Sequence, residues 1–403
     1  MKFSHIADCH LGGWREPKLR EANEKYFVEA IDKTIEEKVD FCLIAGDLFN
    51  TSFPPMDCLK ICVEKLKQLK DSEIPVYIIA GSHDFSPSGK TVISVLESAG
   101  LAVNAAKAEV IDEKLRLKFI TDKKTGVKIT GIIGKRGGLD KNFYAELDRE
   151  HLESEQSKKI FMFHCTIQEI KPKEFEDIEA MSISSLPKNF NYYAGGHVHV
   201  VSKHNLDGYN NVIYPGPTFP NNFAEIEKIK CGSFCIVEDC DGIWKVKHIQ
   251  INIHQVISFS FDCNNKSASE VERDVINEMK KENLQNAIVT LRFFGVLKNS
   301  RASEIKFNEL IEKINLAGAY FVLKNTNKLE SFEFDQIKIS ADNIDDVESL
   351  LIEEHSGKSK IFSAEHEKVL SARLIHSLSI EKDEGQKTAD FEKRIVQEVE
   401  GLF

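Results

Sequence analysis

The stretch His5-Ile6-Ala7-Asp8-Cys9-His10 decides how this chain is interpreted, because an apolar run ends there in an Asp and a His. Four later apolar runs end in Asp, in His or in both, at Gly46-Asp47, Gly81-Ser82-His83-Asp84, His164 and Gly195-Gly196-His197-Val198-His199. Carboxylate and imidazole without thiolate are ligands of Mn, Fe or Zn in hydrolytic sites. The set is too large for one tetrahedral ion. It therefore predicts two ions that share a bridging carboxylate, an arrangement that serves phosphoryl transfer.

Apolar runs and helical periods alternate over the first hundred residues. Strands are expected at 3–7, 41–45 and 76–80, with helices at 18–38, 54–70 and 88–99. This order predicts a layered α/β domain whose Asp and His residues lie just past the carboxyl ends of strands, where such sheets bind ligands. Further strands are expected at 116–120, 127–133, 160–164, 192–197, 212–214, 233–237 and 244–251. They are enough for two sheets that face each other, with the ligand loops along one edge.

The character of the chain changes after residue 254. Strands at 256–261, 287–296 and 319–323 alternate with helices at 268–280 and 303–316, without ligand-type residues at the strand ends. We expect a small α/β domain that shapes access to the site rather than its chemistry. The predicted boundaries are 1–254 for the domain with the ligands, 255–345 for the small domain and 346–403 for a linker and helical tail.

The tail carries two amphipathic helical patterns. One repeats leucine at 370, 374 and 378, and the other places apolar residues at 391, 395 and 399, with Leu402 beyond. Such faces need a cover. Docking on the chain's own domain and docking on a partner's groove or helix pair both satisfy that need.

Composition describes a globular protein of 403 residues, with 42% hydrophobic and 29% charged residues. No apolar run reaches the ~18 residues of a membrane span, and Met1 leads directly into a ligand-bearing strand, so neither a membrane anchor nor a signal peptide is expected. Nine scattered cysteines suit a reducing compartment, hence a cytoplasmic location. The net charge of −11 disfavours a surface coated with basic residues for nucleic acid. Two divalent ions would offset about four units of it, and basic stretches such as Gly134–Gly138 remain.

Ser88-Gly89-Lys90-Thr91 has the ending of a phosphate-binding P-loop, but Asp84 stands where that motif has its first glycine. We expect a helix start there and no nucleotide binding by this chain.

Together the five ligand segments resemble the calcineurin-like metallophosphoesterases. Within them, His5-Ile-Ala-Asp8-Cys-His10-Leu-Gly12, Ala45-Gly46-Asp47-Leu48-Phe49 and Gly196-His197-Val198-His199 resemble the SbcD-type DNA double-strand-break repair nucleases, the meiotic-recombination-eleven family. The resemblance covers about residues 1–250 by motif and the remainder only in layout. It implies a two-sheet α/β/β/α sandwich, a smaller capping domain and a C-terminal helical tail. It also implies binding through 362–403 to a coiled-coil ABC ATPase of the SbcC type.

The resemblance further implies a role for each matching residue. One metal would be held by Asp8, His10, Asp47 and His199, and the other by Asp47, Ser82, His164 and His197, so that Asp47 bridges. His83 would act at the leaving sugar oxygen rather than on a metal, with Asp84 either orienting its ring or serving as a turn carboxylate. Two Mn²⁺ per chain are expected, with Mg²⁺ as the alternative. The implied enzyme is a homodimeric, nucleoid-associated nuclease acting on DNA ends, a 3′→5′ double-strand exonuclease and single-strand endonuclease.

Three departures from the family pattern qualify these expectations. Ser82 stands where the family usually has Asn, whose carbonyl reaches further, so we expect a weaker second metal site. Asn50 stands at a frequent His, and Pro217 at a usual small polar residue. Two other functions stay open: a small-substrate phosphodiesterase or phosphatase, which would need neither the second domain nor the tail, and a repair scaffold with weak catalysis.

Overall fold

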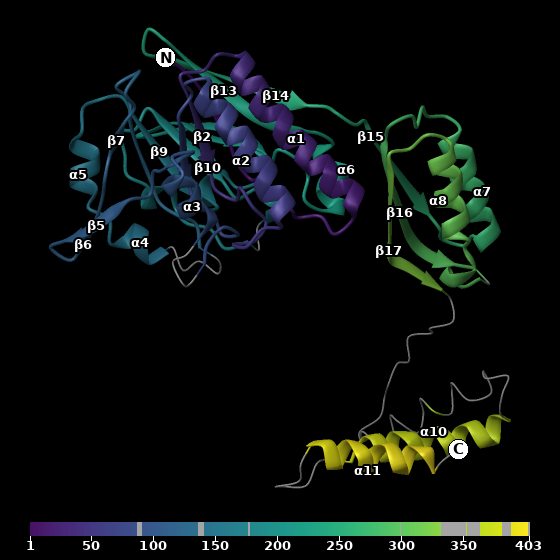
Figure 1. The fold of residues 1–403 in the computed structure, drawn as a ribbon. Coiled ribbons are helices and arrows are strands. Elements are labelled where there is room, and N and C mark those ends of the chain that lie inside the picture. The colour runs from purple at the N-terminus through teal and green to yellow at the C-terminus, as the bar shows by residue number, and fades with distance from the viewer. Residues whose placement is uncertain are drawn as a thin grey trace. The chain divides into compact units, whose positions relative to one another are not determined.

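Two six-stranded sheets form the centre of the protein (Figure 1). The computed structural model describes residues 1–86, 91–135, 141–175, 178–298, 300–331, 352, 363–380 and 388–401. The stretches Ser88–Lys90 and Arg136–Gly138, singled out above, lie outside these residues, as does most of the predicted linker. The chain divides into two units, Met1–Phe332 and Glu333–Phe403.

The first sheet has the order β14-β13-β1-β2-β3-β4. Its parallel part is formed by β1 (Lys2–Ile6), β2 (Phe41–Ala45), β3 (Val76–Ile79) and β4 (Val103–Asn104). The antiparallel hairpin of β13 (Gly232–Cys240) and β14 (Ile243–Ile251) adds to it through pairing of β13 with β1. Residues beyond 230 therefore lie directly beside the first strand of the chain.

The second sheet has the order β11-β12-β10-β9-β8-β7. Its four inner strands are parallel: β8 (Lys128–Gly131), β9 (Lys159–His164), β10 (Tyr192–Gly196) and β12 (Tyr209–Pro215). The edge strands β7 (Ile120–Thr121) and β11 (Val201–Leu206) are antiparallel to their neighbours. The predicted strand 116–120 was wrong as one element, because β6 (Lys114–Leu117) instead forms a separate hairpin with β5 (Ala108–Ile111).

Alternation of side chains explains why these strands are apolar throughout. Along β2, Phe41 and Leu43 enter the core between the sheets, whereas Cys42 and Ile44 enter the core under the helices. Along β9, Ile160 faces the inner core and its neighbour faces the outer one. Each central strand is buried on both faces, as its continuous apolar run requires.

Helices cover the outer face of each sheet. On the first sheet these are α1 (Pro17–Glu36), α2 (Met56–Asp71) and α3 (Val92–Ser98), with α1 and α2 side by side (Figure 1). On the second they are α4 (Lys141–Ala145), α5 (Arg149–Ser154) and the 3-10 turns Gln168–Ile170, Lys173–Phe175 and Ile183–Ser185. The predicted α/β/β/α sandwich is confirmed.

A smaller parallel sheet follows in the same unit. It contains β15 (Val256–Asp262), β16 (Ile288–Leu297) and β17 (Phe321–Ser331), connected by α7 (Ala268–Met279) and α8 (Phe307–Leu316), with a core of its own. A capping box of Ser267 and Glu270 starts α7. The boundaries at 254 and 345 remain predictions.

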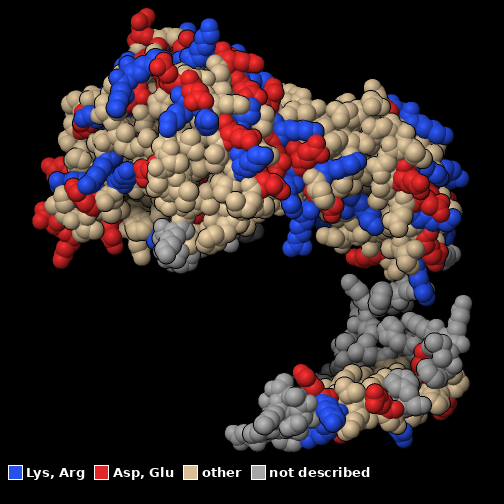
Figure 2. Space-filling model, in the orientation of Figure 1, with Lys and Arg blue, Asp and Glu red and all other residues tan. Residues whose placement is uncertain are grey.

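The second unit contains two helices at the two amphipathic patterns of the tail. They are α10 (Ala364–Leu378) and α11 (Thr388–Glu400). Val369, Leu378 and Val396 are more than half exposed. In the described ranges no helix is long and apolar enough to cross a membrane. On the face shown in Figure 2, Lys and Arg are intermixed with Asp and Glu.

Candidate metal centre

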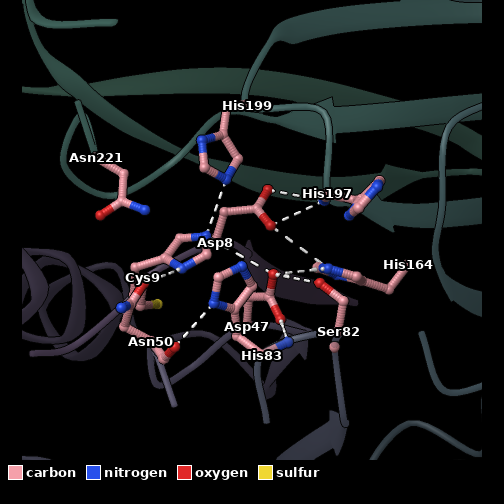
Figure 3. A network of polar contacts seen from close by, with 12 residues as sticks. Asp8, Cys9, Asp47, Asn50, Ser82, His83, His164, His197, His199 and Asn221 are labelled. Carbon is pink, nitrogen blue, oxygen red and sulfur yellow. Dashed lines mark hydrogen bonds and ion pairs between the residues drawn. The ribbon is translucent and has the colours of Figure 1, made fainter. Parts of the chain in front are cut away.

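Loops after β1, β2, β3, β9 and β10 bring their polar side chains to one place (Figure 3). Backbone hydrogen bonds join the loops after β1 and β2. Asp8 N donates to Gly46 O at 3.1 Å, and His10 N donates to Asp47 O at 2.9 Å. The loop after β10 joins them through His197 N, which donates to Asp8 Oδ1 at 2.8 Å. The ligand segments, scattered over the sequence, therefore form one cluster.

Several residues of this cluster have a strained backbone conformation. Left-handed φ values occur at five polar residues of the predicted site: Asp8 (53°), His10 (44°), Asp47 (50°), His197 (96°) and His199 (51°). This conformation is uncommon for residues other than glycine, though Asp and His adopt it more readily than most. It costs on the order of 1 kcal/mol or more per residue, and such strain concentrates at functional sites.

Gly46 shows how closely the loops approach. Its φ is +89°, and a Cβ at this position would lie 2.2 Å from Nδ1 of His164. Any side chain at residue 46 would therefore displace a histidine of the site. This requirement explains the glycine in front of Asp47 physically.

Three overlapping groups have ligand atoms within 4.8 Å of one another: Asp8, His10 and His199; His10, Asp47 and His83; and Asp47, His164 and His197. Apart from Ser82, every predicted ligand appears in one of them. The Ser82 hydroxyl lies 3.4 Å from Asp47 Oδ2, at the same end of the cluster. The structure thus brings together all eight residues proposed from the sequence.

The tautomers of two histidines leave lone pairs facing each other. Nδ1 of His10 lies 3.2 Å from the Asn50 side-chain oxygen, and Nδ1 of His199 lies 3.0 Å from a carboxylate oxygen of Glu225. Both partners are acceptors, so each Nδ1 carries the hydrogen. The two Nε2 atoms, 2.9 Å apart, therefore both present lone pairs. A cation or an extra proton is required between them, and this donor set fits a divalent metal.

His164 and Asp47 repeat this arrangement. His164 Nδ1 donates to Ala45 O at 2.8 Å, which leaves Nε2 facing Asp47 Oδ2 at 3.0 Å. Burial alone would lower the pKa of His164, but the Asp47 carboxylate raises that pKa to about 10. Conversely, burial disfavours the ionised Asp47, yet His164 holds the pKa of this carboxylate well below its usual range. Positive charge is thus strongly favoured between these two side chains.

Asn50 and Asp84 have positioning roles. The backbone oxygen of Asn50 lies 2.8 Å from Nδ1 of His83, and the side-chain oxygen of Asn50 contacts His10. One residue therefore orients two histidines. Asp84 accepts hydrogen bonds from backbone N–H groups of Leu48, Phe49 and Gly81. Burial and the charge of Asp47 raise the pKa of Asp84 to about 7. Two roles were considered for Asp84, and its three backbone hydrogen bonds fit the role of a turn carboxylate.

A cavity of about 790 Å³ opens beside the cluster. One part of its lining is polar, with His10, Asp47, Ser82, His83, His197 and His199, and another is apolar, with Phe175, Ile178, Val198, Val200, Val201 and Ile229. Lys228 also lines it, 5.5 Å from the ring centre of Phe175. The cavity has room for a phosphate group together with an apolar or aromatic moiety.

Comparison with known proteins agrees with this geometry. Residues 1–201 match the family model of the calcineurin-like phosphoesterases. The chain is 30% identical over 296 residues to the DNA double-strand break repair protein Mre11 of Sulfolobus acidocaldarius, covering 71% of this chain and 72% of that protein. The chain belongs to the Mre11 family. Its identity to Mre11 of Methanococcus maripaludis is 29% over 326 residues (78% and 79% coverage), and to Mre11 of Archaeoglobus fulgidus 26% over 431 residues (99% and 95%).

Membership of the Mre11 family makes this chain a metal-binding phosphodiesterase hydrolase, as predicted. The calcineurin-like domain implies a site for two metals, and the groups around Asp8 and around His164 are its candidate residues.

Sequence reasoning missed Glu225 in this Mre11-family chain. Glu225 lies in α6 (Phe223–Ile229), which Asn222 caps by accepting from Glu225 N at 2.9 Å. The pattern Asn222-x-x-Glu225 signals a helix start, so α6 itself was open to prediction. The contact between Glu225 and His199 could not be predicted, because the two residues are far apart in the sequence and no motif connects them.

Proposed function

We propose that this chain is a Mn²⁺-dependent DNA nuclease that processes DNA ends in double-strand-break repair. The observation that carries the proposal is the pair of ligand groups around Asp8 and around His164, which a third group of His10, Asp47 and His83 connects. The Mre11 relatives bear the name of DNA double-strand break repair proteins, which supports DNA as the substrate. The 3′→5′ exonuclease and single-strand endonuclease activities belong to this proposal.

In the proposed site, Asp8, His10, Asp47 and His199 hold one ion, and Asp47, Ser82, His164 and His197 hold the other. Two divalent ions, when bound, supply Lewis acidity that lowers the pKa of water and stabilises the attacking and leaving oxygens of a phosphodiester. The protein's own contribution is orientation. Backbone N–H groups of His83 and His197 fix the carboxylates of Asp47 and Asp8, and Ala45 O fixes the ring of His164.

In this proposal His83 is the proton donor to the leaving sugar oxygen. Its Nδ1 donates to Asn50 O, so Nε2 is the atom that exchanges a proton, and the side chain lines the cavity. A positioned histidine in this role contributes about 10²–10⁴ in rate.

The apolar lining of the cavity favours a nucleotide over a simple phosphate ester. Phe175, Ile178 and Val201 offer surface that a nucleobase can contact while its phosphate reaches the polar lining. Base faces are hidden in a stacked duplex, so such contact needs an unpaired nucleotide. This favours frayed ends and single strands as the form of DNA that enters the site.

The proposed partners are DNA ends, a second copy of this chain and a coiled-coil ABC ATPase of the SbcC type bound through 362–403. The exposed apolar side chains of α10 and α11 support a partner at that tail. We propose a cytoplasmic, nucleoid-associated enzyme.

The test is cleavage of an end-labelled linear duplex with Mn²⁺, with Mg²⁺ and with chelator, next to the variant His83→Ala. Mn²⁺-dependent shortening that the variant loses is the expected result. A small chromogenic phosphodiester, assayed in parallel, separates DNA from small substrates. Bound metal without cleavage of either, together with tight binding of the ATPase to the tail, would establish the scaffold instead.

A further inference from the structure

Helix α6 lies between the metal centre and the small β15–β17 sheet. On one side, Glu225 Oε1 lies 3.0 Å from Nδ1 of His199. On the other, both carboxylate oxygens of Glu227 accept from Nε of Arg292 in β16, at 3.2 and 3.0 Å, and Oε2 also accepts from its Nη2. Residues two apart on a helix point to different sides. One short helix is thus held from two directions by different parts of the fold.

Glu225 is itself held firmly. Its Oε2 accepts from the backbone N–H of Asn221 at 2.7 Å, and its Oε1 accepts from the side-chain amide of Asn222 at 2.6 Å. Glu225 therefore offers a fixed acceptor oxygen to Nδ1 of His199, and the other ring nitrogen, Nε2, faces the cluster.

Arg292 binds α6 by more than charge. Its guanidinium carbon lies 5.1 Å from the ring centre of Phe223, the first residue of the helix. A bidentate ion pair and ring stacking define the orientation of an arginine more sharply than a point charge would. The β15–β17 sheet thereby holds the helix that carries Glu225.

We propose that Glu225 is a positioning residue for His199, and that Arg292 on the small sheet controls this positioning through α6. The small sheet then tunes the affinity of the ion held by Asp8, His10 and His199, and leaves the ion near His164 unaffected. The inference rests on the proposed two-metal site. It gives the small domain a role in metal binding that goes beyond access to the cavity.

The test is calorimetric titration of Mn²⁺ into the metal-free full-length chain and its variants, with thermal unfolding as a check that each is folded. Glu225→Ala is expected to weaken one of two sites by about 10–100-fold. Glu225→Gln, which keeps an acceptor but not the charge, is expected to restore part of that loss. A purely structural effect would weaken both sites together.

Arg292→Gln is expected to weaken the same site by about threefold, the equivalent of one partly exposed ion pair. Arg292→Lys should recover less than the full affinity, because the bidentate geometry is lost. Combined with Glu225→Ala, Arg292→Gln should add no further loss, since both act through one helix.

Tyr320→Phe is the matched control. The Tyr320 hydroxyl donates to Lys18 O at 2.8 Å. This contact joins the small domain to α1 and does not involve α6. The variant is expected to leave both affinities unchanged. Two normal sites in Glu225→Ala, or a Tyr320→Phe effect as large as that of Arg292→Gln, would overturn the inference. A wild-type chain that binds no Mn²⁺ would instead overturn the proposed function.

Discussion

His10 and His199 point their Nε2 atoms at each other across 2.9 Å. The opposite nitrogen of each ring is committed, one to Asn50 and one to Glu225. A cation or a proton must therefore lie between the two Nε2 atoms, and a metal ion competes with that proton. Metal binding and stability are thereby linked.

We therefore expect Mn²⁺ to raise the unfolding temperature and a chelator to lower it. At a free ion concentration one hundred times the dissociation constant, the gain is about 2.7 kcal/mol per site. Differential scanning calorimetry with and without Mn²⁺ measures it. His10→Ala should lose the share of this response that belongs to one of the two sites, whereas His204→Ala, in β11 outside the cluster, should keep the whole response. An equal response in the two variants would contradict a metal at His10.

His83→Ala should lower kcat for DNA cleavage by about 10²–10⁴-fold. Its Mn²⁺ affinity should stay unchanged, because His83 is proposed as a proton donor rather than a ligand. Rates and calorimetric affinities on the same preparation give the answer. His83 shares a potential ligand group with His10 and Asp47, so a parallel loss of affinity would make it a ligand instead.

Ser82→Asn should strengthen the site of Asp47, His164 and His197. The Ser82 hydroxyl stops 3.4 Å from Asp47 Oδ2, and an amide carbonyl reaches further toward an ion. One added ligand is expected to improve affinity on the order of tenfold, equivalent to about 1.4 kcal/mol. Titration calorimetry of Ser82→Asn beside Ser82→Ala separates gain of a carbonyl from loss of a hydroxyl. If all three proteins bind equally, residue 82 is not a ligand.

His5 should make stability depend on pH. Its ring is fully buried, with Nδ1 2.9 Å from the Tyr192 hydroxyl, and burial lowers its pKa from 6.5 to about 3. As the pH falls from 6.5 toward 3, the unfolded chain binds a proton that the folded chain does not, so stability declines by about 1.4 kcal/mol per unit.

His5→Gln removes this titration. Urea unfolding at pH 7.5 and 5.5, with chelator throughout, should show the free-energy gap between wild type and variant changing by about 1.4 kcal/mol in the variant's favour at the lower pH. A gap independent of pH would mean that His5 titrates alike in both states.

The extent to which sequence predicts this fold varies with the kind of strand. The strand 41–45 was predicted with the bounds that the structure has, because a run buried on both faces is apolar throughout. The edge strand β11 (Val201–Leu206) was missed, since it contains Ser202 and His204 on a half-exposed ribbon. A strand buried on both faces has a recognisable apolar sequence, whereas a half-exposed edge strand has a sequence that is much harder to recognise.

The same distinction applies to the site. Asp8, Asp47 and His164 were found because each follows an apolar strand, a local signal. Glu225 and Asn50 act by contacting histidines from other segments, and only the folded chain shows those contacts. The proposed metal ligands can be recognised from sequence motifs, whereas the residues that orient those ligands can rarely be recognised in this way.

The pairing of β13 with β1 has a consequence for the life of the chain before it is finished. The first strand made carries Asp8 and His10 at its end, yet its neighbour β13 begins only at Gly232. During synthesis, which runs from the amino terminus, β1 lacks this neighbour and the centre lacks His197, His199 and Glu225. A nascent chain that ends before β13 (Gly232–Cys240) therefore has neither the neighbour of β1 nor a folded centre built on it.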